Sequence, residues 1–279
     1  MRVMNLAGRL SLAVDGGAVD VAEASGGRFG PDVQSVYDQW AEFRDWAATC
    51  TAPPVPFDER QLGAPVPRPP QVFAIGLNYR DHAEEAGLEL PASPMVFTKF
   101  PASVTGPFDT ITLPGGSVDF EAELVAVIGR TARHVSMDDA WTYVAGLTAG
   151  QDLSERELQT QGPDPAQYNL GKSFAGFAPI GPYLVTPDEF ADPGNLSLQC
   201  ELSGELMQKS HTANLIFSIP QIVAHLSSVL ELWPGDLVFT GTPSGIGWTR
   251  NPRRMITASD ELVTTIGDIG TMRHRFVAA

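Results

Sequence analysis

The chain has 279 residues, of which 43% are hydrophobic and 18% are charged, a composition that is ordinary for a globular protein with a sizeable core. Its formal net charge of -15 argues against a nucleic-acid-binding protein with a basic surface. No apolar run approaches a membrane span, the N-terminus lacks a secretory pattern, and Cys50 and Cys200 form no disulfide or zinc motif. We therefore expect a cytoplasmic protein without a nucleic-acid or membrane partner.

Residues 1–70 are predicted to form a small N-terminal domain that ends in a proline-rich linker. Strand-like patterns at 9–14 and 18–22 precede apolar residues at helical spacing from Val33 to Trp46. Seven prolines within the last twenty residues of this part indicate an extended linker or wrapping arm. Residues 71–279 form the larger domain, which is mixed and strand-rich.

The segment from 76 to 87 begins and ends with glycine, which would suit a mobile lid that carries a short helix. On a helix, His82 and Glu85 would meet at i, i+3, and a carboxylate beside an imidazole orients the ring for general base catalysis. An ordinary surface pair is the alternative. Apolar residues that follow either line a pocket or, as we expect, only pack the lid: Leu88, Leu90, Met95 and Phe97.

Residues 118–128 predict a single strand, because their apolar residues alternate. Asp119, Glu121 and Glu123 would then project from one face, which turns apolar further along and should be buried there. Carboxylates crowded at a buried margin need protons, cationic side chains or a metal. Only Arg130 follows nearby, which favours a hard divalent cation; a solvated acidic face is the alternative.

Asp152 supplies a third carboxylate, where a strand predicted from about Tyr143 gives way to a short helix. Because Asp is a preferred N-cap, capping of that helix is the alternative role. Arg156 and Gln159 would share one helix face and offer a guanidinium and an amide to an anion, or would form a solvated surface.

Lys172 follows a glycine inside an apolar stretch, so it either extends toward solvent or pairs with an anion. A helix predicted to start at Ser218 and a strand from Leu237 lead to the glycine-rich loop 240–247, where Thr242 and backbone N–H groups could bind a carboxylate. The chain has no P-loop, G-x-G-x-x-G or G-x-S-x-G motif, so nucleotide binding, hydride transfer and serine hydrolysis gain no support.

Taken in order, these segments resemble the fumarylacetoacetate hydrolase family. The motifs are Gly-Leu-Asn-Tyr-Arg-Asp-His, Phe-Thr-Lys-Phe-Pro-Ala-Ser, Asp-Phe-Glu-Ala-Glu-Leu, Gln-Asp-Leu-Ser-Glu-Arg-Glu-Leu-Gln, Gly-Lys-Ser-Phe, Pro-Gly-Asp and Thr-Gly-Thr-Pro. The similarity covers residues 60–275 and is to the bacterial branch of acylpyruvate hydrolases and 2-oxo-hept-3-ene-dioate hydratase-isomerases. It implies a β-rich α+β fold with a distorted β-roll as catalytic domain, a small N-terminal α/β domain and assembly as a homodimer.

The resemblance also implies the site residues. It assigns Mg²⁺ or Mn²⁺ to Glu121, Glu123 and Asp152, a catalytic dyad to His82 and Glu85 with Lys172 beside it, and substrate contacts to Arg156, Gln159 and Thr242. Two positions depart from the family pattern: Gln151 stands where asparagine is frequent, and Ala175 stands where aspartate often follows Gly-Lys-Ser-Phe.

We expect these residues to cleave a C–C bond in a β-diketone acid such as an acylpyruvate, through a metal-stabilised enolate. His82 would activate water, and Lys172 would stabilise the developing oxyanion. Decarboxylation of a β-keto acid such as oxaloacetate, hydration or isomerisation of an oxo-dienoate, and a non-catalytic role are the alternatives. Selectivity for the acyl group is expected in residues 86–100 and 160–170.

Overall fold

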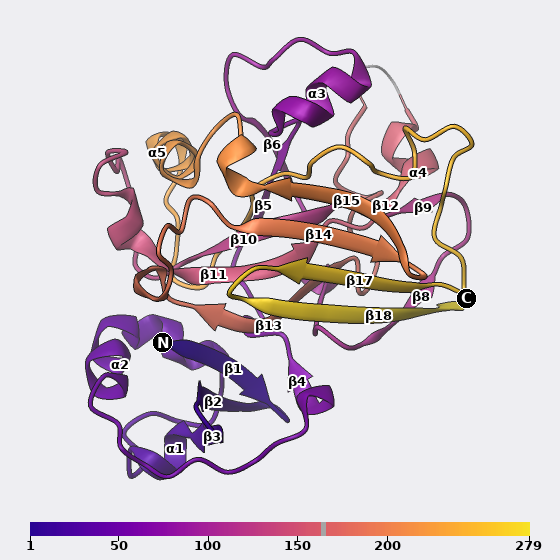
Figure 1. The fold of residues 1–279 in the computed structure, drawn as a ribbon. Helices are drawn as coiled ribbons and strands as arrows, with labels where there is room; N and C mark the ends of the chain where they lie inside the picture. Colours follow the sequence, from indigo (N-terminus) through magenta and orange to yellow (C-terminus); the bar gives the residue numbers. More distant parts are fainter. Residues whose placement is uncertain (163–165) are drawn as a thin grey trace.

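The computed structural model describes residues 1–162 and 166–279, and a long mixed sheet runs through the molecule (Figure 1). In spatial order its strands are β3 (Gly17–Asp20), β2 (Arg9–Val14), β1 (Arg2–Leu6), β13 (Ala178–Val185), β11 (Val144–Gln151), β10 (Ala122–Ile128), β16 (Leu237–Phe239), β5 (Val72–Gly76) and β6 (Met95–Thr98). Two short strands pair with strands inside this order: β4 (Leu62–Gly63) pairs with β1, and β7 (Val104–Thr105) pairs with β13. None of the described helices is long and apolar enough to cross a membrane.

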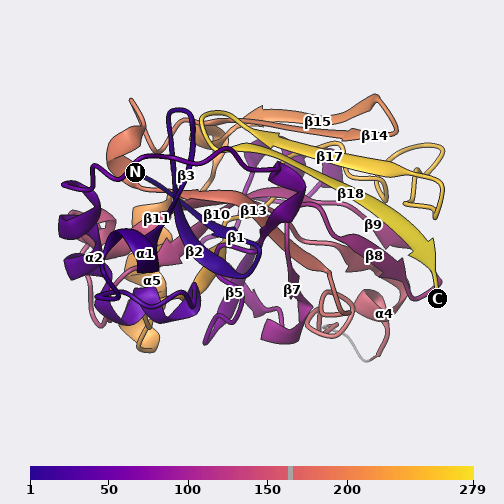
Figure 2. The ribbon, with the colours of Figure 1, turned by 90° about the horizontal axis from the view of Figure 1, so that it is seen from below.

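A second sheet stacks on one face of the main sheet, as the view from below shows (Figure 2). Its strands are, in spatial order, β15 (Glu205–His211), β14 (Ser197–Leu202), β17 (Glu261–Ile266), β18 (Gly270–Ala278) and β8 (Thr110–Leu113). A large hydrophobic core between the sheets joins Leu124 of β10 to Leu198 of β14. This sheet-rich α+β architecture confirms the predicted fold class.

All residues of β10 are buried, since β11 and β16 flank it in antiparallel orientation and both faces are covered. Alternate side chains enter different cores: Leu124 and Ala126 face the second sheet, whereas Val125 and Val127 pack with the N-terminal helices. β10 therefore carries its side chains into the interior on both faces.

The prediction of one unbroken strand over 118–128 was wrong. A short strand, β9 (Val118–Asp119), pairs with β12 (Ser154–Glu155), and β10 begins only at Ala122. Between them, the N–H of Phe120 donates to Asp119 Oδ1 and the N–H of Glu121 donates to Gln151 Oε1. Side chains thus replace the strand ladder at this break.

The N-terminal strands extend the main sheet, because Arg2 of β1 pairs with Val185 of β13. The helix predicted from Val33 to Trp46 is divided into a 3-10 helix, η1 (Gln34–Gln39), and α2 (Trp40–Ala47), because the backbone of Gln39 leaves the helical region. The strand predicted over 18–22 ends at Asp20, whose carboxylate accepts from the N–H of Glu23 and caps α1 (Val21–Ala24).

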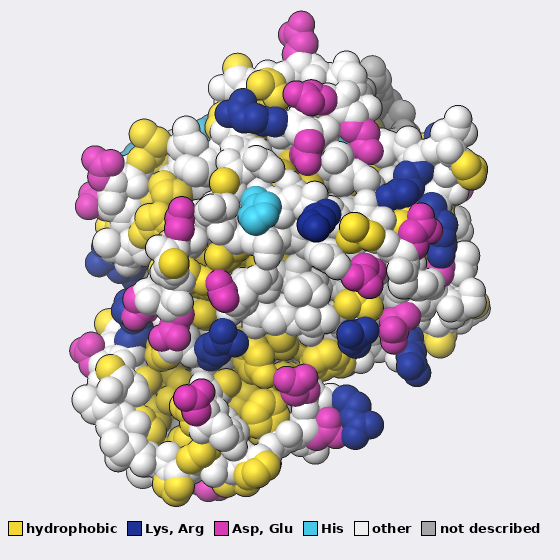
Figure 3. Space-filling model, in the orientation of Figure 1, with side chains coloured by type: hydrophobic (Ala, Val, Ile, Leu, Met, Phe, Trp, Pro, Cys, Tyr) yellow, Lys and Arg dark blue, Asp and Glu magenta, His cyan; other side chains and the backbone are white. Residues whose placement is uncertain are grey.

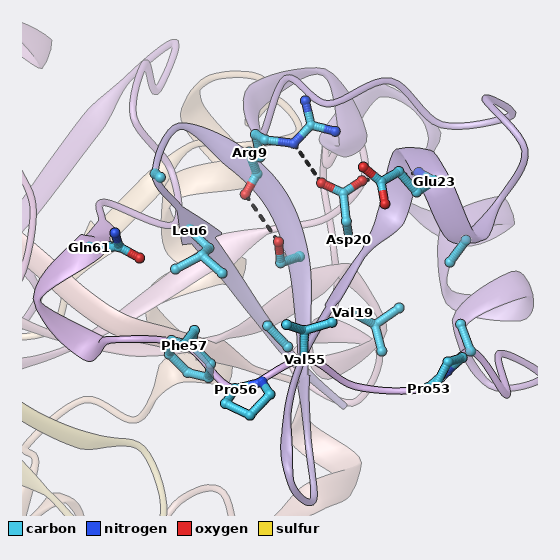
Figure 4. A pocket seen from close by; sticks show the side chains of 15 residues that line it. Leu6, Arg9, Val19, Asp20, Glu23, Pro53, Val55, Pro56, Phe57 and Gln61 are labelled. Carbon is cyan, nitrogen blue, oxygen red and sulfur yellow. Dashed lines mark hydrogen bonds and ion pairs between the residues drawn. The ribbon is translucent and has the colours of Figure 1, made fainter.

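The proline-rich segment lies along the N-terminal strands, where Ala18 and Val55 exchange backbone hydrogen bonds of 2.9 and 2.8 Å. Figure 4 shows a groove beside this contact, with Val55 and Phe57 on its apolar side and the Arg9–Asp20 ion pair at its edge. The groove shares no lining residue with the cavity of the candidate site. The domain boundary at residue 70 and the homodimer stay predictions.

Further helices stand near the edges of the sheets. The predicted helix at Ser218 is confirmed as α5 (Ile219–Val229), with a capping box in which Gln221 bonds back to Ser218. Two shorter helices carry residues of the candidate site: α3 (Arg80–Ala86) and α4 (Arg156–Thr160).

His274 of β18 makes the stability of this fold depend on pH. Its ring is fully buried, Nε2 donates to the carbonyl of Gly106 at 3.1 Å, and burial lowers the pKa of His274 to about 4. Between the ordinary pKa of 6.5 and this value, the unfolded chain binds a proton that the folded chain does not. The free energy of unfolding should therefore fall as the pH drops through this window, by up to about 3 kcal/mol.

Urea unfolding at about pH 7 and about pH 5 tests this expectation. His274→Gln keeps a donor for Gly106 but cannot titrate, so the variant should lose less stability than the wild type. Replacement of the exposed His211 by glutamine is the matched control and should leave the pH dependence unchanged. An equal loss in His274→Gln and the wild type would contradict the assignment.

Candidate metal and catalytic site

Three carboxylates meet where β10 begins and β11 ends. Because Ala122 pairs with Gln151 in the antiparallel register, Glu121 and Glu123 lie beside Asp152. One carboxylate oxygen from each residue lies within 4.8 Å of the others, and all three side chains are buried. This burial excludes the alternative of a solvated acidic face.

The expectation that cationic side chains are scarce around these carboxylates was wrong. Arg130 lies elsewhere, where it donates to Thr142. Lys172 Nζ lies 2.9 Å from Glu121 Oε2 and 2.6 Å from Asp152 Oδ2, and Arg156 Nη2 lies 2.7 Å from Glu121 Oε1. Both cations come from segments distant in sequence, and Lys172 is therefore an anion partner rather than a side chain extended toward solvent.

The ion pairs are distributed unequally, so the carboxylates differ in pKa. Burial alone would raise the pKa of Glu121, but Lys172 and Arg156 lower it to about 2. Glu123 has no lysine or arginine partner among the described residues and accepts only the N–H of Gly241, at 2.7 Å. Burial, together with the charges of Asp152 and Glu121, raises the pKa of Glu123 well above its ordinary value.

A divalent cation fits this arrangement. The donors are hard carboxylate oxygens, which suit Mg²⁺ and Mn²⁺, and one of them is a buried group without a cationic partner. A bound ion would supply the positive charge that no described lysine or arginine provides beside Glu123. The triad of Glu121, Glu123 and Asp152 can therefore bind a metal.

Lys99 is a member of the cluster to which the sequence interpretation gave no role. Its side chain is fully buried, and Nζ lies 2.6 Å from Asp152 Oδ1 while also donating to the carbonyls of Leu153 and Lys172. Burial lowers the pKa of Lys99. In the sequence, the sign of a buried role was that this lysine lies between Phe97 and Phe100. Only the structure shows that Lys99 holds Asp152 in place.

Asp119 does not point at the triad, in contrast to the expectation that it projects with the two glutamates. The break before β10 turns it toward Arg156, whose Nε and Nη2 lie 2.9 and 2.6 Å from Asp119 Oδ2. Arg156 Nη1 also donates to Gln159 at 2.9 Å, so these two residues do share one helix face. The N-cap of α4 is Glu155, which excludes the capping role considered for Asp152.

His82 and Glu85 lie on α3, with Nδ1 of His82 3.4 Å from Glu85 Oε2. Both oxygens of Glu85 accept the N–H of Gly245, at 3.1 and 3.2 Å, so the glycine-rich loop holds this carboxylate. The side chain of His82 is only 14% exposed and lines the same cavity as the triad. The pair is therefore not an ordinary surface pair.

A cavity of about 240 Å³ joins these groups. It is lined by the triad, by His82, Arg156, Gln159, Lys172 and Thr242, and by Ile75, Gly76, Leu77, Leu88, Met95, Phe97, Tyr168 and Ile246. The hydroxyl of Thr242 donates to the carbonyl of Ala122 and accepts from Gln208.

The expectation that the apolar residues after α3 only pack the lid was wrong for Leu88, Met95 and Phe97, since β6 and the chain before it run along the cavity. Residues 163–165 of the predicted selectivity loop lie outside the described residues.

Glu123→Gln tests the metal site, because it removes the charge and keeps the shape. Without added metal, the variant should unfold at a higher temperature than the wild type, since on folding the wild type must either bury an unpaired charge at Glu123 or bind a proton there. Mn²⁺ at about 100 times its Kd should stabilise the wild type by ~2–3 kcal/mol and leave the variant unaffected. Exposed Glu84→Gln is the control and should respond to Mn²⁺ as the wild type does. Full stabilisation of Glu123→Gln by Mn²⁺ would disprove the site.

Known proteins are similar to this chain in sequence and in fold. Residues 71–277 match the family described as "Fumarylacetoacetate (FAA) hydrolase C-terminal". A putative HpcE protein from Mycobacterium smegmatis is 53% identical with a TM-score of 0.94, over 100% of both chains. Maleylpyruvate hydrolase from Sphingobium sp. SYK-6, in complex with manganese (II) ion and pyruvate, is 27% identical with a TM-score of 0.82, also over 100% of both chains.

A mitochondrial oxaloacetate tautomerase of Rattus norvegicus is 36% identical over 277 residues, which cover 96% of this chain and 86% of the relative. A metal-dependent enzyme of the same fold therefore fits both the relatives and the buried triad. These matches confirm the resemblance seen in the sequence motifs: the chain belongs to the fumarylacetoacetate hydrolase family.

Proposed function

We propose that this protein is a Mg²⁺- or Mn²⁺-dependent hydrolase that cleaves a C–C bond in an acylpyruvate-like β-diketone acid. One observation carries the proposal: His82, Lys172 and the three carboxylates of the triad line a single cavity. A general base, a fixed positive charge and a metal site are the groups that such a hydrolysis requires.

Glu121, Glu123 and Asp152 would hold the ion. When bound, Mg²⁺ or Mn²⁺ supplies a Lewis acid that polarises the 2-oxo group and attracts the carboxylate of the substrate. The maleylpyruvate hydrolase neighbour supports the proposal, because its structure contains manganese (II) and pyruvate, and pyruvate is a product of the reaction proposed here.

His82 is the proposed base. Glu85, held by the N–H of Gly245, orients the imidazole, which takes a proton from a water molecule as the water oxygen attacks the distal carbonyl. Lys172 Nζ, held by Asp152 and by Ser154 Oγ at 2.9 Å, presents its charge to the oxygen that becomes negative. As the C–C bond breaks, its electrons remain on the pyruvate carbon, which takes up a proton, and the acyl group leaves as a carboxylic acid.

Arg156, Gln159 and Thr242 are proposed to contact the substrate. All of them line the cavity next to the triad, and the first two are joined by a hydrogen bond of 2.9 Å. Their side chains are buried and hydrogen-bonded, so they would keep their positions as substrate binds.

His82→Ala should lower the kcat for acetylpyruvate by ~10²–10⁴-fold, because it removes the base that activates water. The measurement is the Mn²⁺-dependent loss of the ultraviolet enol band together with formation of pyruvate. The variant should still be stabilised by Mn²⁺, since the triad is intact, and exposed His211→Ala should keep wild-type activity. Retention of most of the activity in His82→Ala would rule out the proposed base.

Oxaloacetate chemistry is the second candidate, because a relative that matches 96% of the chain is named an oxaloacetate tautomerase. Tautomerisation moves a proton between carbon and oxygen and requires no attacking water. Decarboxylation of oxaloacetate and isomerisation or hydration of an oxo-dienoate would use the same metal and cavity.

Oxaloacetate with Mn²⁺ separates the two candidates. A tautomerase changes the enol absorbance without releasing pyruvate, whereas a decarboxylase releases pyruvate and carbon dioxide. We expect acetylpyruvate to be the better substrate. Action on oxaloacetate together with no cleavage of acetylpyruvate would replace the hydrolase proposal by the second candidate.

A further inference from the structure

We infer that the cavity selects a 2-oxo acid with a single negative charge and an uncharged, apolar group at the end remote from that charge. The inference rests on the proposed function and deepens it, since it names the class of acyl group. It depends on where the cations of the cavity are engaged, on the apolar part of the cavity wall and on the charge of the buried cluster.

The lysine and arginine side chains that line the described part of the cavity are already paired with buried carboxylates. Arg156 Nη2 lies 2.6 Å from Asp119 and 2.7 Å from Glu121. Lys172 Nζ lies 2.6 Å from Asp152 and 2.9 Å from Glu121. A second carboxylate on the substrate would have to displace one of these buried ion pairs to gain a cationic partner. If it did not, it would lose its hydration and gain no partner in return.

The apolar part of the cavity wall is formed largely by two segments that lie side by side, and it begins at Phe97, whose ring centroid lies 5.1 Å from Lys172 Nζ. Phe97 and Tyr168 meet edge to face with ring centroids 5.9 Å apart, and the N–H of Thr98 donates to Asn169 Oδ1 at 3.1 Å. The apolar residues on the wall, apart from the two aromatic rings, are Ile75, Leu77, Leu88, Met95 and Ile246.

Neither segment contains a residue that could neutralise a remote carboxylate. No lysine or arginine occurs in residues 83–98 or in residues 157–171. Acidic side chains gather over α3 and the chain beyond it, as the top of Figure 3 shows, and Glu84 and Glu89 are exposed there. Arg80 at the start of α3 is also exposed, and none of these three side chains lines the cavity. Their combined charge is negative and disfavours the approach of a second carboxylate.

Large apolar side chains on this wall remain open to solvent. Leu88 is 57% exposed and Met95 is 42% exposed. An apolar acyl group that covers them gains about 25 cal/mol for each Å² removed from water. A carboxylate in the same place would gain no partner.

The buried cluster points to the same charge on the substrate. We count formal charges and leave His82 aside. The described carboxylates are then Asp119, Glu121, Glu123 and Asp152, and the described cations are Lys99, Arg156 and Lys172. A divalent ion on the triad would leave this cluster with one excess positive charge. A monoanionic 2-oxo acid neutralises that charge, whereas a dianion leaves a buried negative charge uncompensated.

Calorimetric binding to the Mn²⁺-loaded protein tests the inference without relying on turnover. The probes are 6-methyl-2-oxoheptanoate and 2-oxoadipate, uncleavable 2-oxo acids of matched shape that end in an isopropyl group and a carboxylate. We expect the acid with the isopropyl end to bind ~10-fold more tightly or better. Equal or tighter binding of 2-oxoadipate would overturn the inference.

Met95→Lys places a cation on the apolar wall and should narrow or reverse this preference. Met95→Gln has a side chain of similar length without charge, so it is the matched control; it removes apolar surface but adds no cation, and should narrow the preference less than Met95→Lys does. If both variants change the ratio equally, charge at this wall does not govern selection and the inference fails.

Turnover separates the inference from the proposed hydrolysis. The substrates are 4-methylpentanoylpyruvate and succinylpyruvate, which have the same number of non-hydrogen atoms and share the reacting diketone. Faster cleavage of the first supports both statements. Cleavage of both with a preference for succinylpyruvate refutes the inference and leaves the hydrolysis standing. If neither is cleaved while the isopropyl-ended acid still binds more tightly, the hydrolysis fails and the inference stands.

Discussion

The antiparallel register between β10 and β11 is the constraint on which the candidate site depends. It places Glu121 and Glu123 beside Asp152 in the interior, where like charges without compensation would be strongly unfavourable. The chain meets this requirement with cations from three other segments, Lys99, Arg156 and Lys172. Since each of them pairs with a member or neighbour of the triad, the contacts that stabilise the core also hold the carboxylates in position for a metal.

The charged and the apolar groups that line the cavity come from different parts of the fold. The charged groups are buried side chains at the start of β10, at the end of β11 and on α4, together with Lys172. The apolar groups come largely from β6, the chain before it and the segment around Tyr168, much of which is exposed. His82 lines the same cavity from α3 and is held through Glu85 by the loop at Gly245. Under the proposed function, metal binding and selectivity for the acyl group would be carried by separate elements, so one could change without disturbing the other.

Local chemistry made several elements predictable. Ser218 and Gln221 predicted the start of α5, because a capping box needs only neighbouring residues. The end of β11 before Asp152 and the shared face of Arg156 and Gln159 were likewise local properties. The break before β10 was not, because it depends on a hydrogen bond to Gln151, thirty residues away. For the same reason Asp119 was expected at the triad, although it turns to Arg156.

The sequence by itself was enough to identify the family from short motifs and, through that resemblance, to imply the fold class. Motifs and spacing within single elements also singled out the three carboxylates and the His82–Glu85 pair as candidate site residues. Only the tertiary structure decided how the carboxylates are compensated, that Lys99 holds Asp152, and that Leu88 and Met95 line a cavity rather than pack a lid. Burial and ion pairing are properties of segments brought together across the sheets. A linear pattern shows which groups are available, but their partners are set by folding.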